Sequence, residues 1–293
     1  MLPHIRDLSR DAESSTTASA LTSEPDASGV QLRPLVSLAE YQACVALQSD
    51  VWGEAFSDTV PASILQVAAH IGGLVIGAFV GDTLTGFVFG LTGVKNGEIV
   101  HWSHMLGVRA SAREMGIGRR LKEYQRAELA RRGVAREFWT FDPLQARNAH
   151  LNVNRLGVRV IDYAVNMYGT TGSPLHLGIA TDRLIVEMAT EVRPRPTPAN
   201  GVISAPERLP IFTPMPRPGD VLVDGDRPRT ALIEIPWDIQ NGRTLASDEM
   251  LTWRMSTREY FQWAFLHAYR VTSLHRDRDA SRAFYVIDRT GEA

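Results

Sequence analysis

The residues best suited to chemistry lie in one stretch, Arg113-x-x-Gly116-x-Gly118, where a strand-like run gives way to a helical one. The first N–H groups of a helix have no partner within the helix, and the helix dipole is positive there. Glycine tolerates a positive φ and lets a bulky group approach the main chain closely. The spacing therefore predicts a cradle for a phosphate or pyrophosphate. The positive side chains expected around it are Arg113, Arg119 and Arg120.

Two other phosphate-binding motifs do not fit this stretch. The dinucleotide fingerprint needs a third glycine three residues after the second, but position 121 is Leu. The phosphate loop of nucleotide hydrolases needs Gly-Lys followed by Ser or Thr, which is absent here. The elements around the motif are a strand over residues 99–108 and an amphipathic helix that ends at Gly133.

In residue type and placement, the stretch resembles the acyl-CoA signature of the GCN5-related N-acetyltransferases, Gln/Arg-x-x-Gly-x-Gly/Ala after a long strand. The resemblance implies that the strand offers main-chain groups to the pantetheine arm and that the turn holds the pyrophosphate. It also implies direct transfer from acetyl-CoA, or another short acyl-CoA such as succinyl-CoA, to an amine, with no covalent enzyme intermediate. By position, the implied cofactor-binding residues are Leu106, Gly107, Val108, Arg113, Glu114, Met115, Gly116, Ile117, Gly118, Arg119 and Asn148.

The acid that protonates the leaving thiolate is not obvious from the sequence. In many members of the family it is a tyrosine shortly before the glycine that ends the helix after the fifth strand. Counting back from Gly157, that position holds Val153. Water, Tyr163 or Tyr168 would then supply the proton. The alternative is that each tyrosine is a core residue with one hydrogen bond, which is the commoner role of an aromatic hydroxyl in a strand.

A histidine titrates near neutral pH and can take a proton from an ammonium group, so His101 and His104 are candidate bases. They are expected to share one face of the strand 99–108. His104 is preferred because it lies nearer the pantetheine-binding residues, while Glu98 is a rival base. Two packed or surface histidines are the alternative interpretation. No group of His, Cys and carboxylates has metal-ligand spacing, so no metal is expected.

Composition limits the partners. The chain has 293 residues, 44% of them apolar, and a formal net charge of −2, which provides no broad basic surface for nucleic acid. It has one cysteine, Cys44, and neither a membrane-length apolar run nor a secretory signal. We expect a cytoplasmic protein that acts on a small-molecule amine, without a nucleic-acid or membrane partner. A homodimer is left open.

The fold class expected is mixed α/β, with a central mixed sheet flanked by helices and a small C-terminal α/β unit. The predicted element order over residues 30–192 is β-α-α-β-β-β-α-β-α-β-β, which the acetyltransferase fold requires. Half of the 16 prolines fall between Pro194 and Pro218, which indicates a linker. The predicted divisions are a disordered tail (1–29), an acyltransferase domain (30–193), a Pro-rich linker (194–219) and a C-terminal extension (220–293).

Within the extension, strands are expected over 221–226, 230–237 and 282–288, with a helix over 245–271. At about 70 residues this unit would be marginal alone, so it is expected to cover the acceptor side or the edge of the main sheet. In the main domain, Asp142 before Pro143 is expected to cap a helix over 143–156.

The function predicted is N-acylation of a primary amine of a small molecule. A module that binds acyl-CoA without turnover is the alternative, favoured by the missing tyrosine. Acetylation of protein lysines is a further alternative.

Overall fold

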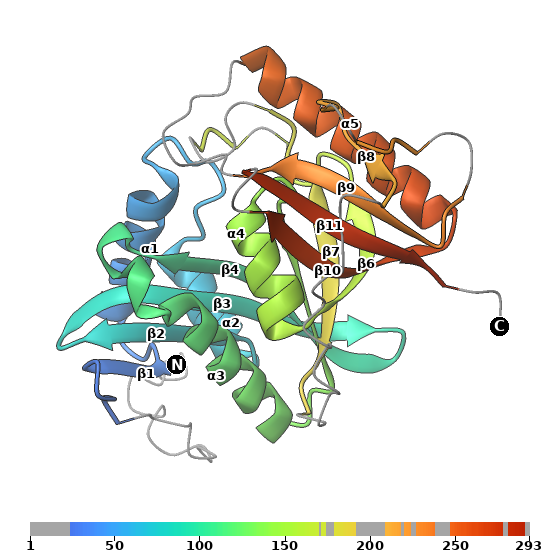
Figure 1. Cartoon of the computed structure of the whole chain (residues 1–293). Coiled ribbons are helices and arrows are strands. Elements are labelled where there is room, and N and C mark those ends of the chain that lie inside the picture. Colours follow the sequence, from blue (N-terminus) through green and yellow to red (C-terminus); the bar gives the residue numbers. More distant parts are fainter. Residues whose placement is uncertain are drawn as a thin grey trace, which may run out of the picture.

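The computed structural model describes residues 24–169, 171–173, 179–191, 209–217, 220–223, 227–237, 247–277 and 281–290. These residues form a seven-stranded mixed sheet with helices on both faces and a second, four-stranded sheet (Figure 1). The expected mixed α/β class is thereby confirmed. Most of the predicted disordered tail and most of the predicted linker lie outside the described residues.

The large sheet has the strand order β1-β2-β3-β4-β5-β7-β6. All neighbouring strands are antiparallel except β4 and β5, which are parallel. The turn between β2 and β3 places Gly81 at a φ of +56°, which glycine adopts without strain in a tight hairpin turn. The strands are β1 Val30–Pro34, β2 Leu74–Val80, β3 Thr83–Lys95, β4 Glu98–Val108, β5 Arg136–Phe141, β6 Arg159–Ala164 and β7 Arg183–Ala189.

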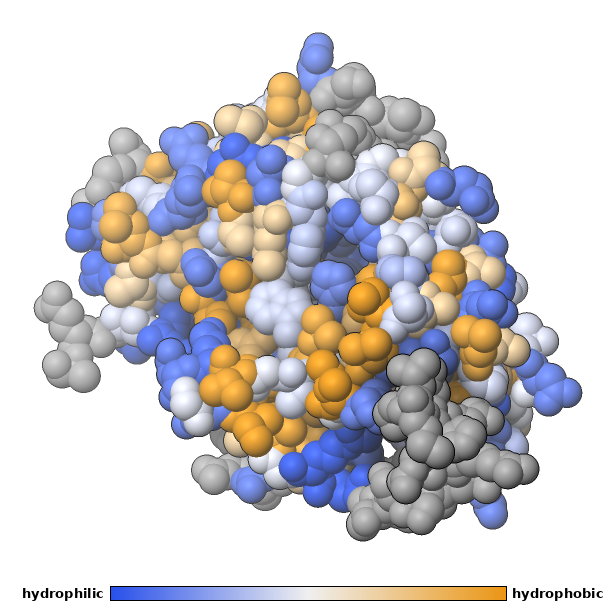
Figure 2. Space-filling view, turned by 180° about the vertical axis from the view of Figure 1, so that it is seen from behind, coloured by the Kyte–Doolittle hydropathy of each residue, from blue (hydrophilic) through white to orange (hydrophobic). Residues whose placement is uncertain are grey.

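Helices cover the two faces of this sheet because its strands alternate in the direction of their side chains. Phe87 and Phe89 of β3 pack under α1 (Leu38–Trp52) and α2 (Ala62–His70). Val88, between them, packs on the other face under α3 (Ile117–Arg131). We call these the α1/α2 face and the α3 face. Figure 2 views the molecule from behind relative to Figure 1; apolar side chains gather on that side, and the surface is recessed near its middle.

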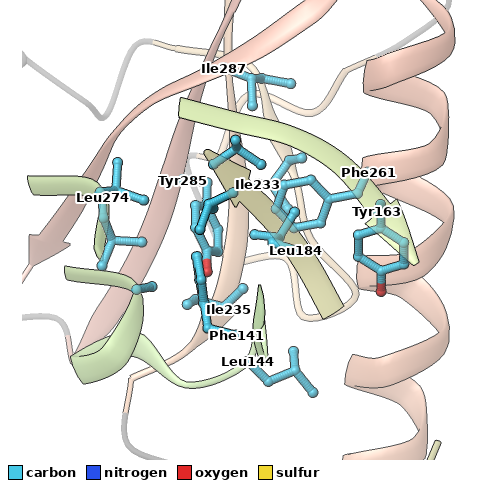
Figure 3. Close-up of a cluster of buried hydrophobic side chains, with 14 of the residues drawn as sticks. Phe141, Leu144, Tyr163, Leu184, Ile233, Ile235, Phe261, Leu274, Tyr285 and Ile287 are labelled. Carbon is cyan, nitrogen blue, oxygen red and sulfur yellow. The ribbon is translucent and has the colours of Figure 1, made fainter. Parts of the chain in front are cut away.

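Apart from a small cluster around Leu232 and Phe284, the C-terminal elements share their core with the main domain. The largest hydrophobic cluster joins β5, β6 and β7 to the small sheet and α5 (Figure 3). Within it, the rings of Tyr163 and Phe261 stack with centroids 5.5 Å apart. The C-terminal unit therefore covers the edge of the main sheet beside β6. Its elements are β8 Ile211–Phe212, β9 Thr230–Pro236, α5 Ser247–Leu266, β10 Tyr269–Asp277 and β11 Arg282–Arg289, with the sheet order β10-β11-β9-β8.

The structure corrects several boundaries in this unit. The helix expected to reach residue 271 ends at Leu266, because Ala268 adopts a left-handed φ of +60° and the chain then pairs with β11 as strand β10. The strand expected over 221–226 is reduced to one bridge from Leu222 to Ile211, and residues 224–226 lie outside the described part. Ile211, placed by sequence in the linker, belongs to β8.

The helix expected over 143–156 is also different in detail. It begins as a short α-helix, α4 (Ala146–Ala149), and continues as a π-helix, η3 (His150–Leu156), before Gly157 ends it at a φ of +66°. Asp142 does not cap this helix; its Oδ1 accepts from the Leu144 N–H at 2.9 Å and so stabilises the turn before it. Among the described residues, no helix is long and apolar enough to cross a membrane.

Candidate active site

Strands β4 and β5 separate soon after they meet. Their ladder runs only from Val100 to Trp102 on β4, although β4 continues to Val108 and β5 to Phe141. Within the described residues, the edge of β4 that faces β5 has no strand partner from Ser103 onward. Main-chain N–H and C=O groups along this edge are available to an extended ligand that carries amides.

A cavity of about 240 Å³ occupies the gap between the two strands. It passes through the sheet, since its walls come from both faces. On the α3 face its walls include Lys122, Trp139, Asn148, Asn152 and Leu156. On the α1/α2 face its walls include Trp52, Phe56, Asp58, His104, Thr140, Tyr168 and Arg183.

The predicted phosphate cradle lies at the end of β4. A 3₁₀ helix, η2 (Ala110–Met115), leads to Gly116, whose φ of +66° is left-handed as predicted, and α3 begins at the next residue. The first intrahelical bond runs from the Arg120 N–H to Gly116 O at 3.2 Å, and no side chain caps the helix. The amides of residues 117–119 therefore remain for a ligand.

Gly118 is helical rather than left-handed, so of the two glycines it is Gly116 that uses the tolerance of a positive φ. A Cβ at Gly118 would lie 3.5 Å from Cδ2 of Leu106, which lines the cavity. The cradle and the cavity are therefore adjacent.

Of the three arginines expected around the cradle, two are engaged by the protein. Arg119 pairs with Glu123, and Arg120 pairs with Asp26. Arg113 is exposed, and its side chain makes no ion pair or hydrogen bond with the described residues. It is the cation best able to meet an anion at this helix start.

The two glycines offer a matched test of backbone strain. Gly116→Ala is expected to lower the free energy of unfolding by about 1 kcal/mol, because an L-residue at a positive φ is strained. Gly118→Ala is expected to be neutral or to raise stability by up to about 1 kcal/mol, because alanine is the better helix former. Urea denaturation of both variants measures the difference; equal effects would contradict it.

His104 occupies a β-bulge. Ser103 pairs with Gly90 and Met105 with Phe89, so His104 is the extra residue between them. The bulge turns its ring into the cavity, edge-on to Phe89 at 6.0 Å and to Tyr168 at 6.4 Å between centroids. Burial lowers the pKa of His104, and nearby Asp58 opposes this. The imidazole is therefore neutral at pH 7 and can accept a proton.

His101 does not share a face with His104, contrary to expectation, because residues three apart on a strand face opposite sides. It is fully buried on the α3 face. Its Nδ1 lies 3.1 Å from the Thr92 hydroxyl, which donates to Gly72 O, and its Nε2 lies 3.1 Å from Nε2 of Gln125. The Gln125 Nε2 is an amide donor, so His101 Nε2 must accept from it. The proton therefore lies on Nδ1, which donates to the Thr92 hydroxyl.

This burial should make His101 a source of acid sensitivity. Burial, helped by the positive charges of Lys122 and Arg132, lowers its pKa to about 3, from 6.5. The neutral form stabilises the fold above pH 6.5, and this contribution is lost as pH falls toward the folded-state value. The destabilisation caused by His101→Gln should therefore shrink by roughly 1.4 kcal/mol per pH unit between pH 6 and 4.

Urea denaturation at each pH measures this change. His70→Gln, at an exposed position, is the matched control and should show no such trend. A cost of His101→Gln that is the same at pH 6 and pH 4 would contradict the assignment of a neutral buried imidazole.

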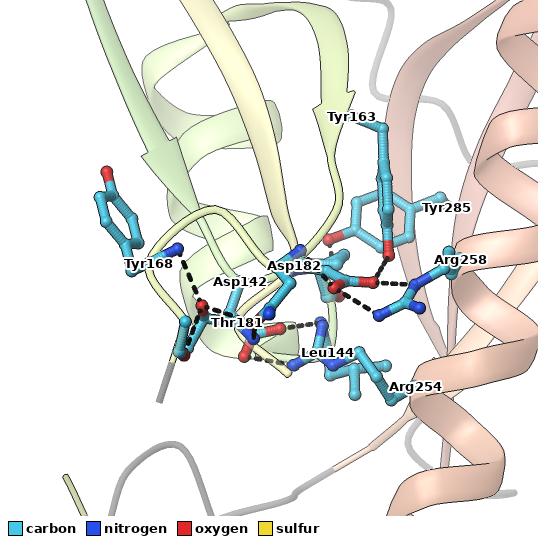
Figure 4. Close-up of polar contacts among 12 residues, drawn as sticks. Asp142, Leu144, Tyr163, Tyr168, Thr181, Asp182, Arg254, Arg258 and Tyr285 are labelled. Atoms are coloured by element: carbon cyan, nitrogen blue, oxygen red, sulfur yellow. Dashed lines mark hydrogen bonds and ion pairs between the residues drawn. The ribbon is translucent and has the colours of Figure 1, made fainter. Parts of the chain in front are cut away.

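The two tyrosines considered as acids lie in different places (Figure 4). Tyr168 lines the cavity, and its hydroxyl is 3.2 Å from the Thr140 hydroxyl. Tyr163 does not line it; its hydroxyl donates to Asp182 at 2.8 Å, and burial raises its pKa. Val153 packs in the shared core.

On the α3 face, polar side chains hold the wall of the cavity in place. The amide of Asn152 accepts from Trp139 Nε1 at 2.7 Å and donates to Asn148 Oδ1 at 2.9 Å. Lys122 pairs with the buried Glu137 at 2.8 Å, and burial lowers the pKa of this lysine. Asn148, expected from sequence to touch the cofactor, thus lies on this wall.

Sequence reasoning missed Asp58, Lys122, Thr140 and Arg183. Each is an ordinary surface-type residue in its local segment, and only the separation of β4 and β5 brings them to one cavity. The alternation of β7 did carry a signal, since Arg183 lies out of phase with its apolar residues Leu184 and Val186.

No known family profile matches this sequence, and no curated protein matches it. Among solved structures, an aminoglycoside 6'-acetyltransferase type Ii is 19% identical, with a TM-score of 0.44, over 56% of this chain and 99% of its own. The ribosomal-protein-S18-alanine N-acetyltransferase from Escherichia coli is 18% identical, with a TM-score of 0.44, over 57% and 97%. An acetyltransferase of the GNAT family from Streptococcus pneumoniae is 11% identical, with a TM-score of 0.45, over 55% and 98%.

In this chain, the order of elements along the main domain, β1-α1-α2-β2-β3-β4-α3-β5-α4-β6-β7, is the order expected from the resemblance to the GCN5-related N-acetyltransferases.

Proposed function

We propose that this protein is an acyl-CoA-dependent N-acyltransferase, with acetyl-CoA as the default donor and a primary amine of a small molecule as the acceptor. The observation that carries the proposal is the continuous path from the unpaired edge of β4 to the uncapped start of α3 at Gly116. An extended amide-bearing arm fits the first part of this path, and a pyrophosphate fits the second.

The residues on this path match the parts of the donor. The amides of residues 117–119 and the Arg113 guanidinium would hold the pyrophosphate, and the main chain of Leu106 to Val108 would bind the pantetheine arm. Asn148 and Asn152 line the same side of the cavity. The thioester would supply an activated acyl carbon at the gap between β4 and β5.

In the transfer, the amine nitrogen bonds to the acyl carbon, the carbon–sulfur bond breaks, and the thiol form of CoA leaves. The neutral imidazole of His104 is placed to hold the proton that the amine loses. Tyr168, beside it, carries a hydroxyl in the cavity that can return a proton to the thiolate. Water is the alternative proton source.

The test is a thermal-shift titration of the full chain with acetyl-CoA, succinyl-CoA and CoA, followed by detection of free CoA released with a panel of amines. Binding at 100 times Kd should stabilise the wild type by about 2.7 kcal/mol. The double variant Arg113→Ala, Gly118→Val should lose this shift, because it removes the free cation and adds bulk against Leu106. Arg270→Ala, at an exposed position on β10, should keep it.

Each outcome decides between functions. Stabilisation by no CoA thioester would exclude acyl-CoA binding. Stabilisation without CoA release for any amine would favour the non-catalytic module, and release with lysine peptides alone would favour a protein-lysine acetyltransferase.

A further inference from the structure

The wall of the cavity on the α1/α2 face carries charges of both signs. Asp58 lies at one part of it, close enough to influence the His104 imidazole. Arg183 lies at another, with its guanidinium 5.3 Å from the ring centre of Tyr168. The ring of His104, which is near Asp58, lies 6.4 Å from the ring of Tyr168, which is near Arg183, so neighbouring side chains connect the two charges.

Arg183 belongs to this wall by strand geometry. In β7, the side chain of Arg183 points to the same face of the sheet as that of Ile185, two residues further on. Ile185 pairs with Thr140 of β5, whose hydroxyl is hydrogen-bonded to the hydroxyl of Tyr168. The opposite face carries Asn148, Asn152 and Lys122, on the proposed donor side. Arg183 therefore faces the acceptor half of the cavity.

Among the described residues, positive charges outnumber negative ones around Arg183. Asp142 pairs with Arg254 at 2.8 Å, and Asp182 binds Arg258 through two bonds of 2.8 and 2.9 Å (Figure 4). With Arg183 included, three arginines and two aspartates leave this group with a net positive charge. Arg183 interacts with other parts of the protein, and its guanidinium contributes a positive charge to the wall of the cavity. A ligand carboxylate would offset it at low cost, because a desolvated guanidinium forms strong charge-assisted bonds.

Two aromatic side chains add an apolar surface to this wall. Trp52 and Phe56 stack with centroids 5.5 Å apart, and both line the cavity. Such a surface suits a hydrocarbon or aromatic body between two charged ends.

We infer that the acceptor is an amino carboxylate with an apolar or aromatic body, whose amine lies toward Asp58 and His104 and whose carboxylate lies toward Arg183. This inference rests on the proposed function, since it names the acceptor of that reaction. It assigns Arg183 and Asp58 as specificity-determining residues.

The experiment measures binding by calorimetry on the full chain, with and without CoA. The probes are two matched sets: 4-(aminomethyl)benzoate, benzylamine and 4-methylbenzoate; and 6-aminohexanoate, hexylamine and hexanoate. In the wild type, at least one amino carboxylate should bind about tenfold or more tighter than both of its single-charge partners, as expected for a charge-assisted bond at each end.

The variants test the carboxylate end and the amine end of the ligand separately. Arg183→Gln should bring the amino carboxylate to within about twofold of the amine. Arg183→Lys keeps the charge but not the planar guanidinium, so it should retain part of the preference. Asp58→Asn should reduce the preference over the carboxylate alone. Each comparison is a ratio of two affinities measured on the same variant. A loss of stability lowers both affinities together and leaves their ratio unchanged. Arg270→Gln is the matched control and should leave every ratio unchanged.

Three results would overturn the inference: equal binding of the amine and the amino carboxylate, a preference unchanged in Arg183→Gln, or no binding of either amino carboxylate at 10 mM. Since these measurements need no thioester, they are independent of transfer. A chain that binds amino carboxylates but never releases CoA would defeat the proposed function alone.

Discussion

Replacing His104 with glutamine is expected to slow acyl transfer by about 10²–10⁴-fold, the usual contribution of a positioned general base. Its ring is the imidazole in the cavity, turned inward by the bulge in β4. The stabilisation of the protein by acetyl-CoA should be unchanged, because the cradle at Gly116 lies at the far end of β4. Steady-state kinetics with the amine found in the release assay measures the first effect, and thermal shift measures the second.

The pH profile separates a base from a packing residue. Burial lowers the pKa of His104 below its usual 6.5, so kcat/KM of the wild type should fall only below that pH, where the imidazole becomes protonated. The remaining activity of His104→Gln should lack this acid limb. His70→Gln is the exposed control. A variant that keeps activity within threefold of the wild type, with the same pH profile, would show that His104 is not the base.

Asp142→Asn is expected to lower the free energy of unfolding by about 3–5 kcal/mol, the cost of leaving a buried charge without its partner. Arg254 is 1% exposed and Asp142 7%, and their side chains meet at 2.8 Å. Within the described residues, Nε and Nη1 of Arg254 have no hydrogen-bond partner, so Asp142 is its main compensation. Asparagine can still accept the hydrogen bond from the Leu144 N–H. The loss of stability therefore reports the removal of the negative charge alone.

The reverse substitution should cost less. In Arg254→Met, Asp142 remains buried, but the nearby positive charge of Arg183 still attracts it. The double variant Asp142→Asn, Arg254→Met should recover most of the stability, because an apolar pair can replace a buried ion pair at little cost. Urea denaturation of the wild type, the two single variants and the double variant gives the coupling free energy between Asp142 and Arg254. A loss below 1 kcal/mol for Asp142→Asn would contradict the importance of this pair.

The ion pair also explains why the C-terminal unit matters to the site. Asp142 follows Phe141, which lines the cavity, and Arg254 lies on α5. The shared core and this pair fix the end of β5 against the C-terminal helix. A deletion of the C-terminal unit is therefore expected to disturb the cavity as well as the stability.

Local patterns in the sequence determined the elements of the main domain. Apolar spacing after Gly116 predicts α3, the Gly81 turn predicts the hairpin of β2 and β3, and Gly116 takes the left-handed φ that glycine favours. These features depend on residues a few positions apart, so periodicity and turn chemistry are sufficient to find them. The place of the phosphate cradle at a helix start follows from the same local signals.

Tertiary structure decided what faces the cavity. The bulge at His104, which depends on the pairing of β4 with β3, places Met105 on the same face of the sheet as His104, where alternation would have put it on the other. Tyr163 and Tyr168 are five residues apart and equivalent by sequence, but their distant partners, Asp182 and Thr140, hold them in different places. Similarly, residues 269–271 continue a helical pattern but form a strand because β11 offers them a ladder. Contacts between residues far apart in the chain are set by packing, and no local pattern encodes them.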